Sequence, residues 1–338
     1  MNILKEKLKY LLTNIIMNMS FLRKYQPLFY KDFIMEKDYI CLLNTLKDMD
    51  NLNILIVGNH GSGKTSLLEA TIKEYYNEYH QLNNNDKFNN ILYINNLKEQ
   101  GIQYYRNEVK TFCQTKSLIP GKKKFIVLDD IDNINEQSQQ VFRNCIDKYS
   151  HNINFICSCL NTQKVIDSIQ SRCTIIKIKP IQKNLLEKIS FNIQNKENIK
   201  ISKEANDFLI NISNNSIRQI INNLEKFKIL NKKININDAK SICTNISFFD
   251  FEIYTNLWIN NQLEKSSKYI LSLIDKGYSV MDILDGYFSY IKLNNIIDEN
   301  IKYKIIKIIC KYITIFHNTH ENSIELILFT NELIKLKK

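Results

Sequence analysis

The chain has 338 residues, of which 44% are hydrophobic and 24% are charged, and its formal net charge is +11 at pH 7. This composition excludes a disordered chain and is typical of a folded protein with two or three domains. The basic excess favours a polyanionic partner such as nucleic acid, because basic surface releases counterions condensed on phosphates.

The first 20 residues are predicted to form an N-terminal extension. Lys and Glu interrupt its apolar residues, which favours an amphipathic helix over a membrane span or a signal segment. No transmembrane stretch is expected elsewhere, and no membrane partner. The eight cysteines include no C-x-x-C pair. They are predicted to be reduced core thiols of an intracellular, non-secreted protein, not zinc ligands.

Apolar runs and helical stretches alternate through the first half of the chain. Strands are predicted at 53–57, 91–95, 124–129, 154–160 and 174–179. Alternation of this kind predicts an α/β fold, a parallel sheet with helices on both faces. After Pro180 the strand signals stop. Helices are then predicted at 182–196, 202–212, 216–230, 237–243 and from about 250 to the end.

These patterns predict an α/β domain at 21–179, a small helical domain at 180–232 and an all-α domain at 233–338. Glycine and proline are scarce, with 7 and 3 residues, which favours long helices over a turn-rich β protein.

Three of the seven glycines lie within six positions, in the sequence GNHGSGKT at 58–65. The pattern G-x-x-x-x-G-K-[ST] between a buried strand and a helix is a P-loop, whose backbone N–H groups bind nucleotide phosphates. Lys64 is expected to contact the β- and γ-phosphates, and the Thr65 hydroxyl to ligate Mg²⁺. The predicted phosphate-binding residues are Gly58, Asn59, His60, Gly61, Ser62, Gly63, Lys64, Thr65 and Ser66.

A second apolar strand ends in two carboxylates, Asp129 and Asp130. We expect Asp129 to hold Mg²⁺, directly or through water, and Asp130 to lie beside the attacking water. Phosphoryl transfer also needs positive charge at the transition state, for which Arg172 and Arg218 are candidates. The sequence therefore predicts an ATPase that uses ATP and Mg²⁺.

Several segments together resemble one family, the small subunits of replication factor C, which are AAA+ clamp loaders. The similar segments are FLRKYQPLFYKDF (21–33), GNHGSGKTS, GIQYYRNEVKTF (101–112), VLDDID (127–132) and the run at 139–173 that ends in IQSRC. The resemblance covers about residues 21 to 290. It implies an AAA+ domain followed by a helical lid and a collar that joins subunits into a heteropentamer.

The resemblance also implies roles for single residues. Tyr25 and Pro27 would lie near the adenine, and Asn161 would be the sensor-1 residue that positions the water or the γ-phosphate. Arg172 would be a finger that reaches into the neighbouring subunit's ATP site. Arg218 would be the sensor-2 arginine of the lid. Without the resemblance, the sequence favours a surface arginine over a finger for Arg172. Arg218 is then equally compatible with an exposed helix face, and Asn161 with an ordinary strand end.

The implied function is DNA-stimulated, ATP-dependent loading of a sliding clamp of the PCNA type onto primer–template DNA. It would take place at sites of DNA replication, in a nucleus or a viral replication compartment. One alternative is a structural subunit of the same complex that binds ATP and lends Arg172 but hydrolyses weakly. A remoter one is a branch-migration or initiator ATPase, for which the final helices lack a DNA-reading module.

Three departures from the family pattern stand out. Gln26 replaces an arginine in the opening motif, and Asn215-Ser216 replaces Gly-Asp before Arg218. We expect that turn to survive, because Asn tolerates left-handed backbone. Asp130 replaces a glutamate, so its shorter carboxylate would reach the water only if the backbone shifts.

Residues 101–124 contain six basic residues and one acid, Glu108, and are candidates for DNA contact, since a loader must bind phosphates without reading bases. The resemblance favours Arg106, Lys110 and Arg143, although Arg143 is also suited to coupling subunits. The lysines at 122–124 are expected to form a solvated face. Tyr287 and Tyr290 are expected in a helical core or an interface rather than stacked on bases.

Overall fold

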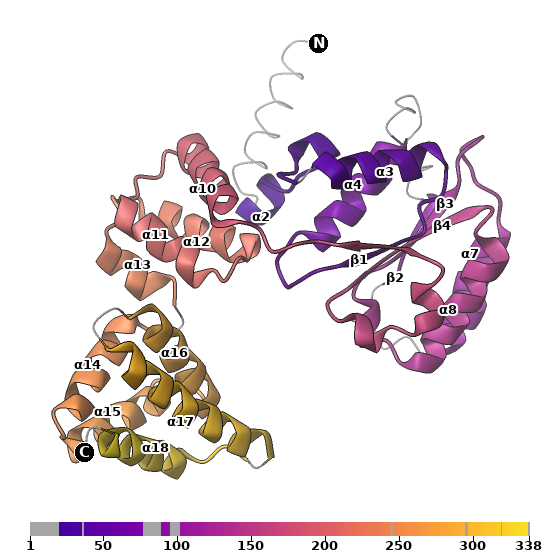
Figure 1. Cartoon of the computed structure of the whole chain (residues 1–338). Coiled ribbons are helices and arrows are strands. Elements are labelled where there is room, and N and C mark those ends of the chain that lie inside the picture. Colours follow the sequence, from indigo (N-terminus) through magenta and orange to yellow (C-terminus); the bar gives the residue numbers. More distant parts are fainter. Residues whose placement is uncertain are drawn as a thin grey trace. The chain divides into compact units, whose positions relative to one another are not determined.

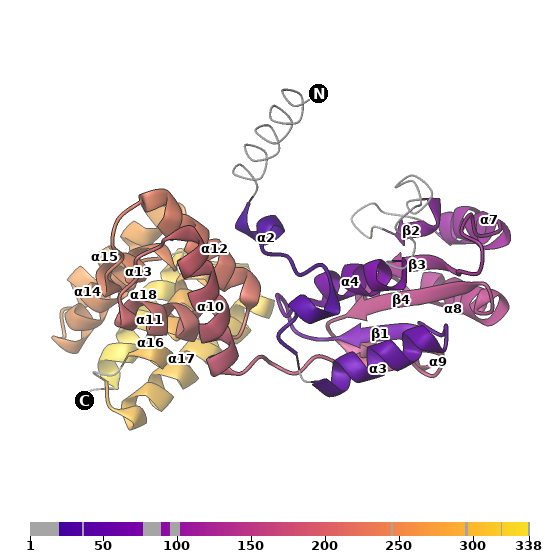
Figure 2. The same ribbon diagram turned by 90° about the horizontal axis from the view of Figure 1, so that it is seen from above.

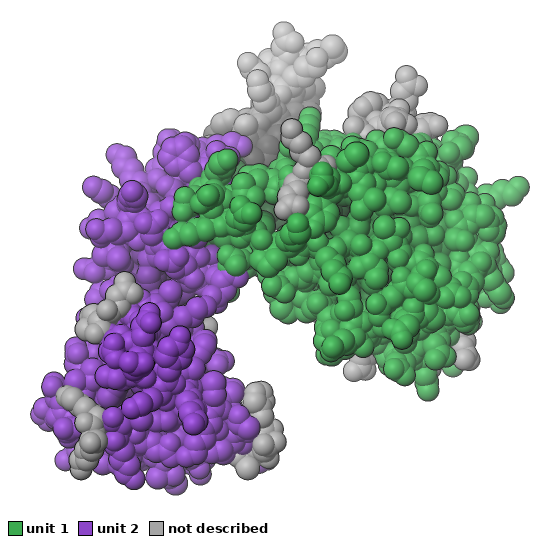
Figure 3. All heavy atoms as spheres, in the orientation of Figure 1, with its two compact units in different colours: residues 1–188, 215–222 green, residues 189–214, 223–338 purple. Residues whose placement is uncertain are grey.

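The computed structural model describes residues 20–35, 37–76, 89–94, 102–244, 246–294, 297–318 and 320–336. The N-terminal extension predicted from the sequence, apart from Ser20, lies outside these residues. The chain forms two compact units (Figure 3). Unit 1 contains the residues up to Lys188 together with Asn215–Asn222, and unit 2 contains Ile189–Asn214 and the residues from Asn223 onward.

Unit 1 is built on a five-stranded sheet in the order β2-β3-β4-β1-β5. The strands are β1 (Ile54–Val57), β2 (Ile91–Ile94), β3 (Lys124–Leu128), β4 (Ile153–Cys159) and β5 (Thr174–Lys177). All neighbouring strands pair in parallel, and Figure 2 shows β3, β4 and β1 side by side. The parallel sheet predicted from the sequence is therefore confirmed.

Helices cover both faces of this sheet (Figure 1), as parallel sheets require. Successive residues of a strand point to opposite faces. Ile54 and Ile56 accordingly pack with α4 (Lys64–Tyr76) and α3 (Lys37–Asp48), whereas Leu55 packs with α7 (Lys110–Gln114) and α8 (Glu136–Tyr149). Every residue of β3 and β4 is buried, which fits central strands covered on both sides.

Short helical segments complete unit 1 at the ends of strands and longer helices. They are α2 (Phe21–Lys24), η1 (Tyr30–Asp32), α6 (Ile102–Tyr104), η2 (Tyr105–Val109), η3 (Ile131–Asn133), η4 (Thr162–Lys164) and α9 (Asp167–Gln170).

The chain after β5 is helical, as the sequence predicts. The helices are α10 (Lys183–Glu197), α11 (Lys203–Ile212), α12 (Ile217–Leu230), α13 (Ile236–Ile242), α14 (Phe248–Ile259), α15 (Leu263–Asp275), α16 (Val280–Leu293), α17 (Glu299–Asn318) and α18 (Ser323–Lys335). The lid and collar boundaries proposed from the sequence stay a prediction. No helix among the described residues has the length and apolarity needed to span a bilayer.

Aromatic side chains fill the core of unit 2. Tyr287 and Tyr290 are buried there, and the Trp258 Nε1–H donates to the Tyr287 hydroxyl at 2.9 Å. A buried tyrosine hydroxyl needs such a partner, because burial without a hydrogen bond costs free energy. The expectation that these tyrosines serve a helical core is confirmed.

The three lysines at 122–124 do not form a solvated face, so that prediction was wrong. Lys124 is 3% exposed, and its ammonium donates to the carbonyl oxygens of Phe112 and Thr115 at the end of α7. Lys123 Nζ donates to the Asp50 carbonyl oxygen at 2.7 Å, and Lys122 Nζ lies 4.4 Å from the centre of the Tyr75 ring. The last carbonyls of a helix lack partners within it, which explains why a buried ammonium is favourable there. Burial lowers the pKa of Lys124.

Candidate nucleotide site

The loop between β1 and α4 has the geometry of an anion-binding loop. Gly61 and Gly63 adopt positive φ angles of 69° and 94°, which side chains with a Cβ rarely tolerate. Gly58 follows β1 directly, and its N–H donates to the Cys159 carbonyl oxygen at 3.3 Å. The loop runs into the first turn of α4, where unpaired backbone N–H groups and the helix dipole attract anions.

Lys64 is the first residue of α4, and its side chain lies against this loop. Its ammonium donates to the carbonyl oxygens of Gly58 and Asn59 at 3.0 and 3.2 Å, and the residue is 7% exposed. Burial lowers the pKa of Lys64, while Asp130 and Asp129 act in the opposite direction. A charged donor next to the glycine loop is suited to binding phosphate oxygens.

The two carboxylates after β3 lie beside the start of α4. The Thr65 hydroxyl donates to Asp129 Oδ2 at 2.8 Å, and the hydroxyl of Ser158 on β4 donates to Asp129 Oδ1. One hydroxyl oxygen and one carboxylate are thus close enough to bind the same ion. Hard oxygen donors of this kind fit Mg²⁺, which takes few protein ligands and completes its shell with phosphates and water.

Asp130 follows directly and has a left-handed backbone, with φ 53° and ψ 55°. Its N–H donates to the Ser158 hydroxyl oxygen at 3.0 Å. Burial raises the pKa of its carboxyl, and Asp129 raises it further, while Lys64 opposes the shift. Aspartate is among the few residues enriched at positive φ, so an aspartate is well suited to this backbone.

The hydrogen bonds of the Asn161 side chain do not place it beside Lys64 or the acid pair. It is exposed, and its carboxamide oxygen accepts the Gln163 N–H at 2.9 Å at the start of η4. Among the described residues it makes no hydrogen bond to Lys64, Asp129 or Asp130. Ser158, which the sequence analysis missed, makes hydrogen bonds to both acids of the pair. The available signal was a serine near the end of a predicted buried strand, where a hydroxyl needs a hydrogen-bond partner.

The start of α12 meets the glycine loop. The Ile217 N–H donates to the Gly61 carbonyl oxygen at 3.1 Å, and Ser216 and Arg218 line the space beside the Gly61 Cα. The structure therefore brings exposed Arg218 close to the phosphate loop. The turn before it includes Asn215 at φ 63°, which confirms that asparagine supports a left-handed turn here.

A methyl group at Gly61 will be far more damaging than one at Gly63. An ideal Cβ at Gly61 would lie 2.1 Å from Ser216 Oγ, whereas one at Gly63 meets no heavy atom within 4 Å. Both substitutions carry left-handed strain of about 1–2 kcal/mol, and Gly61→Ala adds an overpacking cost of about 1–3 kcal/mol. We expect Gly61→Ala to lower the unfolding free energy more than Gly63→Ala in urea titrations. Equal losses would show that α12 does not dock on this loop.

The segment around Tyr25 and Pro27 contacts α4 through a side-chain hydrogen bond. The Gln26 carboxamide donates to Glu69 Oε2 at 2.8 Å, one turn beyond Thr65. Tyr25 is half-buried with its ring 5.7 Å from that of Phe21, and Pro27 is also half-buried. This contact keeps the segment that contains Tyr25 and Pro27 next to the helix that starts at the phosphate loop.

Arg172 lies at the opposite edge of the sheet from the phosphate loop. It precedes β5, where Thr174 pairs with Ile54 at the start of β1, whereas Gly58 follows the end of β1. Four strand residues separate these edges by about 13 Å. The Arg172 guanidinium is 31% exposed, pairs with the Asp147 carboxylate on α8 and donates through Nη1 to the Ser168 carbonyl oxygen at 2.7 Å. Arg172 is thus presented at the surface, away from its own loop.

The three candidates for DNA contact, Arg106, Lys110 and Arg143, lie in three different helical segments. Lys110 is exposed at the start of α7, and Arg106 lies in η2 with its side chain outside what the structure describes. Arg143 Nη2 lies 3.2 Å from Asp147 Oδ2, so Asp147 contacts both Arg143 and Arg172. These ion pairs lower the pKa of the Asp147 carboxyl. Arg143 therefore belongs to the same surface cluster as Arg172.

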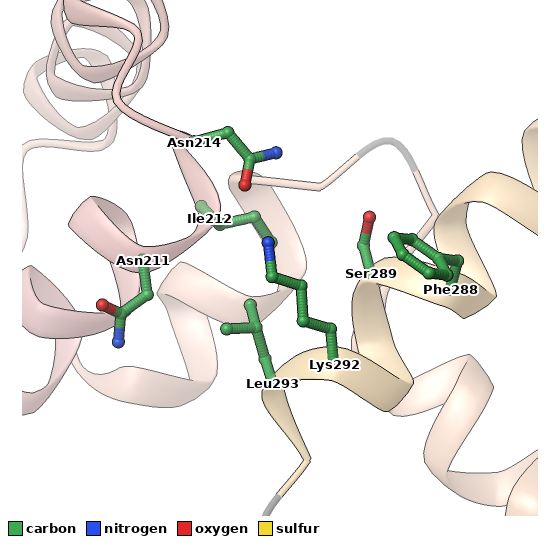
Figure 4. Close-up of a pocket in the computed structure, with 7 residues that line it drawn as sticks. All are labelled: Asn211, Ile212, Asn214, Phe288, Ser289, Lys292 and Leu293. Carbon is green, nitrogen blue, oxygen red and sulfur yellow. The ribbon is translucent and has the colours of Figure 1, made fainter. Parts of the chain in front are cut away.

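Unit 2 contains a small open pocket between the end of α11 and α16 (Figure 4). Its lining residues are Asn211, Ile212, Asn214, Phe288, Ser289, Lys292 and Leu293. Lys292 supplies the charged group of this lining, which has no acidic partner for a metal and no glycine loop for a phosphate. The loop of unit 1 is the stronger candidate for a functional site.

Three family models match successive parts of the chain. Residues 54–181 match "ATPase family associated with various cellular activities (AAA)", residues 187–241 match "RFC1-like, AAA+ ATPase lid domain", and residues 250–312 match "Replication factor C C-terminal domain". Together they cover most of the described chain.

Curated relatives match over nearly their whole length. A replication factor C small subunit of Acanthamoeba polyphaga mimivirus is 27% identical over 86% of this chain and 89% of its own. Replication factor C subunit 4 of Saccharomyces cerevisiae is 27% identical over 86% and 88%, and the small subunit of Methanococcus vannielii is 28% identical over 80% and 85%. Among solved structures, a mutant of Thermotoga maritima RuvB shares the fold at a TM-score of 0.50 and 15% identity, over 79% of this chain and 90% of its own.

Proposed function

The chain belongs to the replication factor C small-subunit family of AAA+ ATPases, and we propose that it hydrolyses ATP as a subunit of a clamp loader. In this proposal it works with other loader subunits in a heteropentamer, opens a sliding clamp of the PCNA type and places it on primer–template DNA. The proposal rests mainly on one observation, which is that two groups of residues lie at opposite ends of the parallel strands in unit 1. The residues proposed to bind the phosphates and the metal lie at one edge of the sheet, and Arg172 lies at the other.

In the proposed site, each residue acts on a separate part of the bound nucleotide. The backbone of the loop from Gly58 to Ser66 and the Lys64 ammonium bind the phosphates, and Thr65 and Asp129 hold Mg²⁺. The ion, when bound, neutralises charge on the phosphate oxygens. Asp130 orients the attacking water and accepts its proton, which requires the ionised carboxylate.

The remaining assignments extend this mechanism. Arg218 reaches the phosphates from α12, which explains its position beside Gly61. Tyr25 and Pro27 flank the adenine, and Arg172 completes the site of the next subunit. The proposed role of Asn161 at the γ-phosphate requires its side chain to leave the Gln163 N–H. Arg106, Lys110 and Arg143 are proposed phosphate contacts for DNA at sites of replication inside the cell.

The function is tested by reconstitution. The chain, purified with the proteins that assemble with it, should form a complex of five subunits by native mass measurement. That complex should turn over ATP faster when clamp and primed DNA are present. A homohexameric ring, or turnover that ignores both clamp and DNA, would count against a clamp loader.

Asp130→Glu separates an active site from the weak-hydrolysis alternative. We expect no large rise in turnover, because the longer glutamate must adopt the left-handed backbone that suits aspartate, at a cost of about 1–2 kcal/mol. Asp130→Asn, a control of equal shape without the charge, should lower turnover by at least about 10²-fold. A large gain in turnover for the glutamate variant would instead favour a structural subunit with a poor site of its own.

A further inference from the structure

Ser158 carries a hydroxyl inside the fully buried strand β4, in which Asn154 is the other polar residue apart from the cysteines. It is 0% exposed and faces Ile56 across the β4–β1 pair. The strand order places β4 between β3, which ends at the acid pair, and β1, which leads to the phosphate loop. A hydroxyl in such a position destabilises the fold unless its hydrogen-bonding capacity is used.

The Ser158 hydroxyl is used twice, and both bonds go to the acid pair. Its proton is donated to Asp129 Oδ1, and its oxygen accepts the Asp130 N–H at 3.0 Å. The other oxygen of the Asp129 carboxylate accepts the Thr65 hydroxyl at 2.8 Å. One side chain therefore fixes the rotation of the Asp129 carboxylate and, through the backbone, the direction in which Asp130 leaves the strand.

We propose that Ser158 is a positioning residue for ATP hydrolysis, which links the metal-binding carboxylate of Asp129 to the water-orienting carboxylate of Asp130. This inference rests on the proposed function. Ser158 itself touches neither the water nor the phosphates. Its role differs from the one implied for Asn161, whose carboxamide oxygen accepts the Gln163 N–H at the start of η4.

The mechanism of this effect is geometric. Asp130 has a left-handed backbone, which non-glycine residues adopt at a cost and which local hydrogen bonds have to hold. Without the hydroxyl, the Asp130 N–H loses this acceptor and the Asp129 carboxylate loses this donor. Both acids then sample orientations in which the ion and the water are misplaced. Removing such an outer partner of a metal ligand typically costs 10–100-fold in metal affinity or activity.

The test uses the full chain in its assembled complex, with Ser158→Ala, Ser158→Thr and Ser266→Ala. Ser266 is a matched control because it is also 0% exposed, but its hydroxyl bonds to carbonyl oxygens of its own helix in unit 2. We expect Ser158→Ala to lower the maximal ATP turnover roughly 10–100-fold with little change in KM for ATP, and to raise the Mg²⁺ concentration needed for half-maximal turnover. Ser158→Thr, which keeps the hydroxyl, should recover most of the turnover, and Ser266→Ala should not alter it.

A second readout does not depend on hydrolysis. Amide hydrogen exchange of the segment 129–133 in the nucleotide-free chain should be faster in Ser158→Ala than in the wild type and in Ser266→Ala. If the wild-type complex hydrolyses no ATP, the proposed hydrolysis is refuted. Faster exchange in Ser158→Ala would still show that Ser158 positions the acid pair. Unchanged exchange would overturn the inference, and so would an alanine variant with wild-type turnover and Mg²⁺ dependence.

Discussion

Lys64→Ala should abolish ATP turnover at the site of this subunit while the fold persists. The ammonium is the buried positive charge at the phosphate loop, bound to the carbonyl oxygens of Gly58 and Asn59. Removing one preorganised donor at developing charge costs about 10²–10³-fold in rate, and loss of phosphate affinity adds to this. Turnover of the assembled complex and binding of a fluorescent ATP analogue measure the two effects.

The control is Lys73→Ala, which removes an exposed lysine from the same helix and should leave both quantities unchanged. Thermal unfolding without nucleotide should be nearly the same for both variants. If Lys64→Ala retained nucleotide affinity and full turnover, the loop would not be the phosphate site.

Arg172→Ala should remove hydrolysis at the neighbouring subunit's site and leave nucleotide binding at its own site intact. The guanidinium is partly exposed at the edge of the sheet opposite its own phosphate loop, so in the proposed complex it would act on the nucleotide of another chain. Arginine fingers contribute about 10³–10⁵-fold to turnover at the site they complete. Single-turnover hydrolysis in the assembled complex measures how many sites still react.

Arg143→Ala is the matched control, because Arg143 contacts the same Asp147 carboxylate from within α8. It removes a basic side chain from this cluster without removing the proposed finger, so one-site loss is expected for Arg172→Ala alone. Both variants are compared without DNA, since Arg143 is also a proposed DNA contact. If both variants lost the same number of reacting sites, Arg172 would have no role beyond that of one charge in this surface cluster.

The sequence predicted the parallel sheet, the phosphate loop and the acid pair, because these depend on local patterns. A buried run before GNHGSGKT leaves few alternatives to a strand, a loop and a helix. The left-handed turn at Asn215 was also predictable, since few side chains tolerate that backbone.

Features set by distant parts of the chain were not predictable in the same way. The burial of Lys124 depends on the end of α7, whose free carbonyls lie beside the start of β3 only in the folded chain. The bonds of Ser158 require β4 to lie next to β3, a pairing that strand patterns alone do not reveal. The attachment of Arg172 to Asp147 likewise joins two segments 25 residues apart.

In the proposed complex, Lys64 serves this subunit's ATP site and Arg172 serves the neighbour's. The most direct measurement is the number of ATP molecules hydrolysed per complex in a single turnover, for Lys64→Ala, Arg172→Ala and the double variant. Effects on separate sites add, whereas effects within one site do not. One site should be lost in each single variant and two in the double variant. A double variant that loses no more sites than Lys64→Ala alone would place Arg172 in its own subunit's site and refute its role at the neighbouring site.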